Sequence, residues 1–313
     1  MSRATGADKS RLAHLLVLAT VAVWGSTFVV VKGALRDCSP LLFNQLRMLL
    51  AFAALLLVNG GSLRRLRGRS LLGGALAGAL LAAGYELQTV GLLYTTPSHS
   101  AFLTGLVVVL VPLFSVAPRL RAPGAMPPRM VHLLGAAGAL AGIALLTTPA
   151  GTPFRQLAAG LNRGDVLSLL CAVAFALHLL MLSHLASWMP TRQLATLQIG
   201  FAALSMTVLT PALEHTHLVW SRALVLALVV CALFATAAAF SIQSWAQKHL
   251  QASHTAMLLA LEPAFALLCS LLFFREPLTL RSGLGAAVIL ASLLLTELAS
   301  ASPVAEQPEA NLV

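Results

Sequence analysis

Very few ionisable side chains interrupt the long apolar stretches of this sequence, and four of them are placed where they could do chemistry. They are two acids, one arginine and one histidine: Glu86, Glu262, Arg47 and His178. A charge at the centre of an apolar helix costs about 2.5–3.5 kcal/mol on insertion scales, so a retained one usually has a role or a partner. Such groups could bind a charged or polar ligand or exchange a proton. A buried ion pair or a satisfied core group is the alternative.

The sharpest hypothesis concerns Glu262, which lies near the middle of the apolar stretch 252–274 and directly precedes Pro263. Proline removes one backbone N–H and frees a carbonyl one turn earlier, which favours an interrupted helix; a simple kink is the alternative. A buried carboxyl near a cation such as Arg47 can be balanced between its two protonation states. Glu262 could therefore exchange a proton, bind a cationic amine or pair structurally with Arg47, and the sequence leaves these roles open.

Polar and aromatic side chains with helical spacing form a second candidate set. Two groups with the spacing i, i+3, i+4 each share one helix face: Tyr85, Gln88 and Thr89, and Phe240, Gln243 and Ser244. An aromatic ring, an amide and a hydroxyl on one face suit a polar ligand with an apolar body, although hydrogen bonds between helices are the alternative. Glu86 falls off this face. Trp24 could line a cavity or serve in packing.

The elements that position these residues must hold a large apolar surface. The chain has 313 residues, of which 58% are hydrophobic and 10% are charged, and its mean hydropathy is +0.88. Soluble domains carry about 25% charged residues, whereas a membrane-spanning helix needs about 20 apolar ones. Ten apolar stretches are present: 12–31, 41–59, 71–93, 98–118, 130–148, 165–187, 193–210, 220–246, 252–274 and 281–299. We therefore expect an all-α membrane protein with ten transmembrane helices in the lipid bilayer.

Charge and small residues indicate how these helices are arranged. The net charge of +10 is spread between the apolar stretches, which argues against nucleic acid as a partner. If the N-terminus is cytoplasmic, twelve of the 20 Lys and Arg residues lie in inside segments, seven lie in outside loops, and Arg47 lies within a span. Cytoplasmic loops carry an excess of Lys and Arg, so both termini are predicted to be cytoplasmic. The glycine rows Gly74 to Gly78 and Gly138 to Gly142 suit close helix approach.

The two halves of the chain resemble each other. At a constant offset of 155, residues 85–101 and 240–256 share four identities, at Gln88, Ser98, His99 and Ala101. Two tandem repeats with an odd number of helices must be inverted relative to each other, an arrangement of many secondary transporters. We expect one five-helix repeat at 1–150 and the other at 151–313, with a polar C-terminal tail. His99 should lie near the outer and His254 near the inner membrane surface.

Short motifs occur along nearly the whole chain: Trp24-Gly25-Ser26, Arg47, Gln88-Thr89, Gly164-Asp165, Gln243, Glu262-Pro263, Arg275-Glu276-Pro277 and Gly283 to Gly285. In their order and spacing, the sequence resembles the EamA-type transporters of the drug/metabolite transporter superfamily. One departure is the stretch Val116-Ala117-Pro118-Arg119, where that family often has a Gly-Glu pair. The resemblance implies a ten-helix bundle with a central cavity and the export or import of small metabolites.

Together these observations predict a secondary transporter of the inner (cytoplasmic) membrane that works by alternating access. Its substrate would be a small metabolite, such as an amino acid, a nucleobase or a drug-like compound, with protons as a candidate coupling ion. No P-loop, HExxH or GxSxG motif occurs, so we expect no enzyme activity, no cofactor and no metal. A membrane-embedded lipid-acting enzyme and a structural membrane subunit are the alternatives. The predicted binding and translocation residues are Trp24, Arg47, Tyr85, Glu86, Gln88, His178, Phe240, Gln243 and Glu262.

Overall fold

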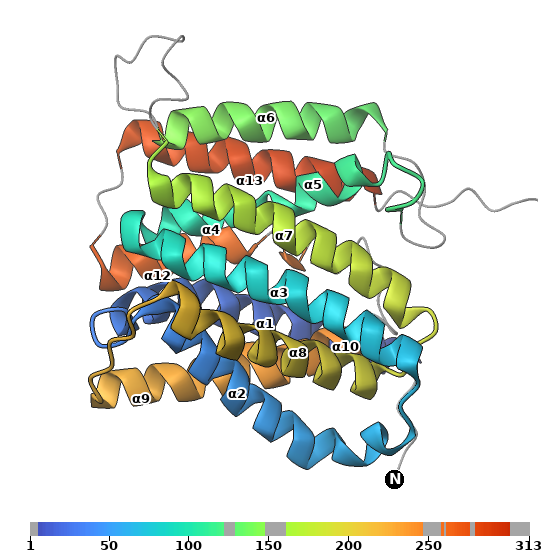
Figure 1. The fold of residues 1–313 in the computed structure, drawn as a ribbon. Helices are drawn as coiled ribbons and strands as arrows, with labels where there is room; N and C mark the ends of the chain where they lie inside the picture. The colour runs from blue at the N-terminus through green and yellow to red at the C-terminus, as the bar shows by residue number, and fades with distance from the viewer. Residues whose placement is uncertain are drawn as a thin grey trace, which may run out of the picture.

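The computed structural model describes residues 6–121, 129–147, 161–246, 258–259, 261–275 and 279–300. This part of the chain is a bundle of helices that run roughly along one direction (Figure 1). Its only β pairing, among the residues described, is a single antiparallel bridge between Cys38 and Leu218 in two loops. The predicted all-α fold class is therefore confirmed.

Each apolar stretch predicted from the sequence overlaps a helix of the structure. The first half contains α1 (Gly6–Ala34), α2 (Pro40–Asn59), the 3-10 helix η1 (Gly60–Arg65), α3 (Gly68–Tyr94), α4 (Pro97–Gly105), α5 (Val107–Phe114) and α6 (Met130–Thr147). The second half contains α7 (Arg163–Ala186), α8 (Thr191–Leu213), α9 (Arg222–Val229), the π-helix η3 (Val230–Ala238), α10 (Ala239–Ala246), α12 (Glu262–Phe273) and α13 (Leu280–Ser300).

Seven helical stretches of the described chain are long and apolar enough to cross a membrane: Arg11–Ala34, Pro40–Arg64, Gly68–Tyr94, Pro97–Phe114, Arg163–Ala186, Thr191–Leu213 and Arg222–Gln243. Three shorter apolar stretches lie at the remaining predicted spans: Met130–Ile143, Glu262–Phe273 and Leu280–Leu295. Large apolar side chains point outward from these helices, and Leu57 and Val58 on α2 are 90% and 77% exposed. Lipid can cover such a surface, and the chain is a multi-pass membrane protein.

Two of the predicted spans are interrupted, and only one of the two breaks, the one beside Pro263, was expected from the sequence. The span 98–118 is divided at Leu106 into α4 and α5 and ends at Phe114. In the span 252–274, α12 begins at Glu262, and Pro263 occupies its first turn, where a missing N–H costs no helical hydrogen bond. The expected interruption beside Pro263 is present. Glu262 opens α12, and most of the predicted span before it lies outside the described residues.

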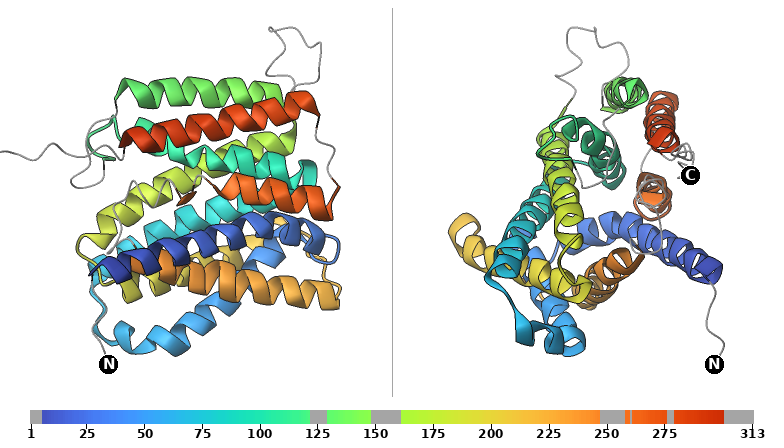
Figure 2. Two further views of the ribbon diagram at one scale, coloured as in Figure 1. Left: turned by 180° about the vertical axis from the view of Figure 1, so that it is seen from behind. Right: turned by 90° about the vertical axis from the view of Figure 1, so that its right-hand side faces the viewer.

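Glycines allow several helices to approach backbone to backbone, as the glycine rows predicted. A Cβ built on Gly78 of α3 would lie 2.7 Å from the backbone oxygen of Gln198 on α8. A Cβ on Gly142 of α6 would lie 2.8 Å from the backbone oxygen of Gly285 on α13. The helices α6 and α13 consequently lie side by side along one edge of the bundle in both views of Figure 2.

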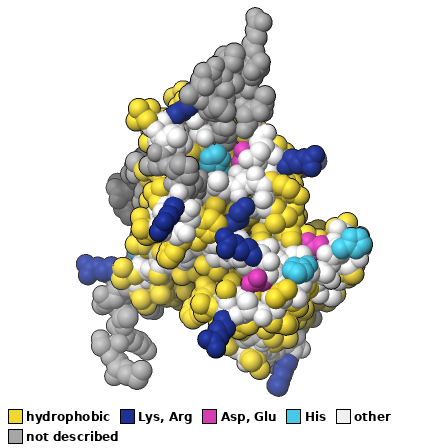
Figure 3. Space-filling model, turned by 90° about the vertical axis from the view of Figure 1, so that its left-hand side faces the viewer, with side chains coloured by type: hydrophobic (Ala, Val, Ile, Leu, Met, Phe, Trp, Pro, Cys, Tyr) yellow, Lys and Arg dark blue, Asp and Glu magenta, His cyan; other side chains and the backbone are white. Residues whose placement is uncertain are grey.

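At one end of the bundle, the loop 35–39 before α2 pairs with the loop 214–221 after α8. The backbone N–H of Ser39 donates to the carbonyl of His217 at 2.9 Å, and the N–H of His217 donates to the Ser39 hydroxyl at 3.2 Å. Figure 3 looks onto the end at which these loops lie, where charged and histidine side chains are scattered among hydrophobic ones. The two halves of the chain are thus joined across this end.

The helices α2 and α8 are tied to each other near both of their ends. Glu214, just after α8, accepts hydrogen bonds from the backbone N–H groups of Leu41 and Leu42 at 3.2 and 3.1 Å. Its carboxylate therefore caps the N-terminus of α2, where the helix dipole favours an anion. Beyond the other end of α2, the side-chain amide of Gln193 donates to the carbonyl of Ser62 at 2.8 Å.

Candidate functional site

Arg47 of α2 points into the bundle, and only 2% of the residue is exposed. Its Nε donates a hydrogen bond to the Thr236 hydroxyl of η3 at 2.8 Å, and its Nη2 donates to the Tyr85 hydroxyl of α3 at 3.1 Å. The guanidinium carbon lies 4.3 Å from the centroid of the Tyr85 ring, a cation–π contact. Groups from α3 and η3 therefore hold this buried cation in one position.

The structure does not bring Arg47 and Glu262 together as an ion pair. Within the described part of the chain, the one acid–base pair closer than 4.0 Å joins His99 and Asp165. Arg47 is instead surrounded by two neutral hydroxyls and an aromatic ring. The structural pairing considered from the sequence is therefore wrong.

Trp24, Phe240 and His178 form an aromatic cluster between α1, α10 and α7. The indole Nε1 of Trp24 donates to the carbonyl of Ala235 at 2.7 Å, and its ring lies 5.8 Å from that of Phe240. Phe240 meets the His178 ring edge-on at 6.2 Å. His178 is hydrogen-bonded through Nε2 to Oε1 of Gln198 on α8 at 2.8 Å. The cluster thus offers flat apolar surface beside polar ring atoms.

The π-helix η3 lies at the meeting point of these two groups. The Thr236 hydroxyl accepts from Arg47 and donates to the carbonyl of Cys231, five residues earlier, at 2.8 Å. Ala235 directly precedes Thr236, and its carbonyl accepts a hydrogen bond from the Trp24 indole. Both α1 and α2 therefore bond to the same turn of η3, and π-helical turns frequently occur at functional sites.

Asn44, one turn before Arg47, connects α2 to the acid of α3. Its Nδ2 donates to the Tyr85 carbonyl and to Oε2 of Glu86, both at 3.0 Å, and its Oδ1 accepts from the Thr89 hydroxyl at 3.1 Å. The other carboxyl oxygen of Glu86 is buried and has no hydrogen-bond partner among the described residues. Asn44 therefore links α2 to the Glu86 carboxyl and to the backbone of Tyr85, while the Tyr85 hydroxyl is bonded to Arg47.

The helices that flank the two breaks, α4 and α12, contact each other beside Glu262. A Cβ on Gly105, the last residue of α4, would lie 2.8 Å from Cγ of Pro263. A Cβ on Gly25 of α1, which follows Trp24, would lie 2.8 Å from the backbone oxygen of Glu262. The first turn of α12 is therefore enclosed between α1 and the break after α4, and the Glu262 side chain is half-buried there.

The contacts above link five of the predicted site residues: Trp24, Arg47, Tyr85, His178 and Phe240. Gln88 points elsewhere, because its amide donates to Thr104 of α4 at 3.5 Å. Gln243 is buried on α10, one turn beyond Phe240. Ser253 and His254, which matched Ser98 and His99 in the repeat, lie outside the described residues.

Sequence reasoning missed four polar or aromatic residues of this neighbourhood: Asn44, Phe175, Gln198 and Thr236. Asn44 could have been found, because it precedes Arg47 by one helical turn. Gln198 bonds His178 from α8, a helix that held none of the predicted site residues. Phe175, whose ring meets that of Tyr85 edge-on at 5.4 Å, looks like any other apolar residue of its helix.

His99 lies in the first turn of α4, a helix that begins at one end of the bundle (Figure 1). Its Nδ1 is 3.7 Å from Oδ1 of Asp165, a carboxylate whose side chain is only 1% exposed. Asp165 also accepts from the Thr95 hydroxyl at 2.5 Å and forms a capping box with Asn162 at the start of α7. His99 is thus near one end of the bundle. Its place near the outer membrane surface stays a prediction.

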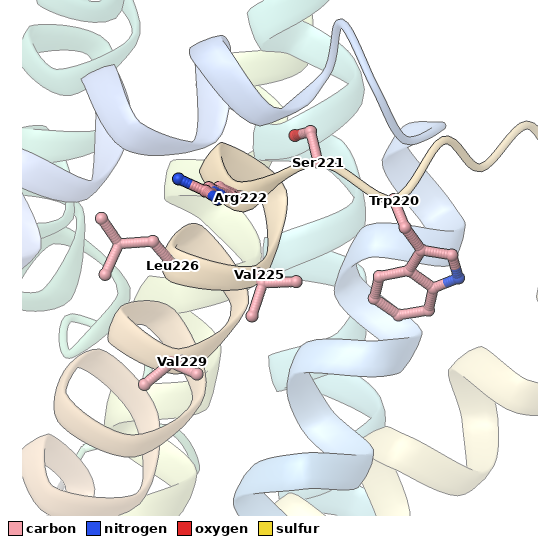
Figure 4. Close-up of a pocket in the computed structure, with 6 residues that line it drawn as sticks. All are labelled: Trp220, Ser221, Arg222, Val225, Leu226 and Val229. Atoms are coloured by element: carbon pink, nitrogen blue, oxygen red, sulfur yellow. The ribbon is translucent and has the colours of Figure 1, made fainter.

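A separate hollow lies on the outer surface at the start of α9 (Figure 4). It is lined by Trp220, Ser221, Arg222, Val225, Leu226 and Val229. The hollow is open and mostly apolar, and it includes none of the predicted site residues. The polar groups between the helices, rather than this surface, are therefore the candidate site.

Comparisons with known proteins agree with this architecture. The sequence model of the EamA-like transporter family matches residues 11–148 and again residues 162–298. A protein of known crystal structure has a similar fold, with a TM-score of 0.66, 19% sequence identity, and coverage of 92% of this chain and 98% of that one.

A relative from Archaeoglobus fulgidus, described as an uncharacterized transporter, is 34% identical over 289 residues. This similarity covers 92% of the chain and 87% of the relative. The family match extends over nearly the same residues as the helices described above. The chain belongs to the EamA-like transporter family.

Proposed function

We propose that the protein is a secondary transporter that moves a small metabolite across the cytoplasmic membrane by alternating access. The observation that carries this proposal is the convergence of polar and aromatic side chains from α1, α2, α3, α7 and the η3–α10 segment inside an apolar bundle. Amino acids, nucleobases and drug-like compounds remain the substrate classes to test, since each combines polar groups with an apolar body.

The helix contacts support two inverted five-helix repeats, at 1–150 and 151–313. The packing of α1 on α12 has its counterpart in that of α7 on α4, and α2 on η3 corresponds to α8 on α3. The breaks at Leu106 and Leu261 are separated by 155 residues, the offset of the sequence repeat. In Figure 1, α1 and α7 run in opposite directions, as do α6 and α13. Ten membrane-spanning helices follow from this arrangement.

The distribution of cations supports an orientation with both termini in the cytoplasm. The segment around η1, the residues after α5 and the start of α8 lie at one end of the bundle in Figure 1. They contain most of the inside cations counted above. The loops 35–39 and 214–221, at the opposite end, would then face away from the cytoplasm.

Glu262 suits a role in proton coupling. Its half-buried carboxyl forms no ion pair within the described part of the chain, so a proton can be gained or lost without breaking one. It opens a helix beside a break, and transporters commonly place coupling sites at discontinuous helices. A proton gradient would then drive the substrate.

Purified protein in proteoliposomes tests this function directly. Metabolite extracts from overexpressing and control cells identify compounds whose levels change, and those compounds are then offered to the vesicles with and without an imposed pH gradient. We expect saturable uptake that protein-free vesicles lack. If well-folded protein exchanges none of the compounds that change in cells, the transporter function is refuted.

A further inference from the structure

Arg47 is a buried cation without a counter-ion in the described part of the chain. Its neighbours are the hydroxyls of Thr236 and Tyr85 and the Tyr85 ring, all of which are neutral partners. Neither Glu86 nor Glu262 lies within 4.0 Å of it. A buried charge normally requires a paired charge, because desolvation costs several kcal/mol per ion. The missing partner is therefore an anion that this part of the chain does not supply.

The guanidinium is held firmly and still has donors to spare. Its Nε and Nη2 each donate one hydrogen bond, whereas Nη1 makes none to any described residue. A guanidinium has five N–H groups in a planar fork that matches a carboxylate. Since two side chains already fix its position, little conformational freedom remains to be lost when an anion binds.

The surroundings of Arg47 indicate what the rest of the ligand resembles. Thr236, which accepts from Arg47, follows Ala235, whose carbonyl holds the indole of Trp24. The ring of Trp24 in turn lies 5.8 Å from Phe240. Flat apolar surface therefore lies one residue along η3 from the cation, which suits a planar apolar group joined to an acidic one.

We propose that the guanidinium of Arg47 binds the carboxylate of an organic-anion substrate, whose apolar body lies toward Trp24 and Phe240. This inference rests on the proposed transport function and deepens it by naming the substrate class. The substrate carboxylate would supply the counter-ion that Arg47 lacks. The empty transporter would leave this cation uncompensated, so substrate binding should also stabilise the fold.

Matched pairs of acids and amides test the proposal. Benzoate and phenylacetate are titrated against benzamide and phenylacetamide, using full-length protein in which Trp24 is the only tryptophan (W188F, W220F, W245F). Fluorescence and thermal stability report binding. We expect each acid to bind at least tenfold more tightly than its amide, and Arg47→Gln to abolish that preference. Arg222→Gln, an equivalent change of a cation in the surface hollow on α9, should leave it unaltered.

Equal affinity for acid and amide, or no saturable binding of either acid at millimolar concentration, would overturn the proposal. Arg47→Gln can also fail to fold, and Thr236→Asp then provides a second test, because it places a carboxylate beside Nε. We expect Thr236→Asp to lose acid binding, to retain any amide binding, and to melt at a higher temperature than Thr236→Asn. Acid binding to Thr236→Asp with wild-type affinity contradicts the proposal.

Transport measurements separate this inference from the proposed function. Uptake of neutral or cationic metabolites alone, unchanged in Thr236→Asp, would retain the transporter and refute the anion site. Acid binding that depends on Arg47, without uptake of any compound, would retain the anion site and refute transport. Uptake of carboxylates that is lost in Thr236→Asp supports both.

Discussion

The variant Gly25→Ala tests whether α1 and α12 approach so closely that no side chain fits between them. A Cβ at residue 25 would lie 2.6 Å from Cβ of Phe265, 2.8 Å from the Glu262 carbonyl oxygen and 2.9 Å from the backbone nitrogen of Ala266. Two of these atoms belong to the backbone and cannot rotate away. Ordinary contact begins at 3.4 Å, so the helices would have to separate by about 0.8 Å, the difference between 3.4 and 2.6 Å.

Inserting a methyl group into such a contact typically costs about 1–3 kcal/mol. Alanine also stabilises a helix by about 1 kcal/mol relative to glycine, which offsets part of this cost. Gly33→Ala is the matched control, because it lies on the same helix and a Cβ there meets nothing within 4 Å. We therefore expect Gly25→Ala to be about 1–3 kcal/mol less stable than Gly33→Ala.

Unfolding of both purified variants in the same detergent, by heat or by a graded denaturing detergent, measures this difference. A Gly25→Ala protein as stable as Gly33→Ala would refute the close approach of α1 to α12. The first turn of α12, which contains Glu262, would then not be enclosed by α1.

Three further predictions follow from the same contacts. Glu262→Gln should express and fold but lose uptake driven by a pH gradient while retaining substrate exchange; uptake with wild-type pH dependence would exclude proton coupling at this residue. Because Glu262 and Arg47 do not pair, the losses of stability in Glu262→Gln and Arg47→Gln should add within about 0.5 kcal/mol in the double variant. A double variant more stable than either single one would indicate an ion pair after all. Reporter enzymes fused after residues 69 and 160 should report opposite membrane sides, and a cytoplasmic signal from both would exclude the inverted repeat.

The sequence predicted the helices well, because a long apolar stretch in lipid must satisfy its backbone internally and has few alternatives to a helix. It predicted their interruptions less well. The break before α12 is marked by Pro263, but the break at Leu106 follows only a glycine in an apolar run. The π-helical turn of η3 left no sequence signal, since its residues also suit an α-helix. The positions of helix breaks and π-helical turns depend on packing against neighbouring helices.

The candidate site was predicted as a set of residue types but not as a set of contacts. The rarity of charges in apolar stretches identified Arg47, Glu86 and Glu262. It could not reveal that Arg47 meets Thr236, which is 189 residues away, rather than Glu262. Helical spacing determines which side chains share a face, whereas the partner across the interface depends on the packing of other helices. That information is absent from a single sequence.

The ties between α2 and α8 have a mechanical consequence. Hydrogen bonds join Glu214 to Leu41 and Leu42 near one end, and Gln193 to Ser62 near the other. At about 0.5–1.5 kcal/mol for each bond, prising the pair apart would cost several kcal/mol. We therefore expect α2 and α8 to move together as one rigid unit. A conformational change of the bundle is then least costly when the other helices move relative to this pair.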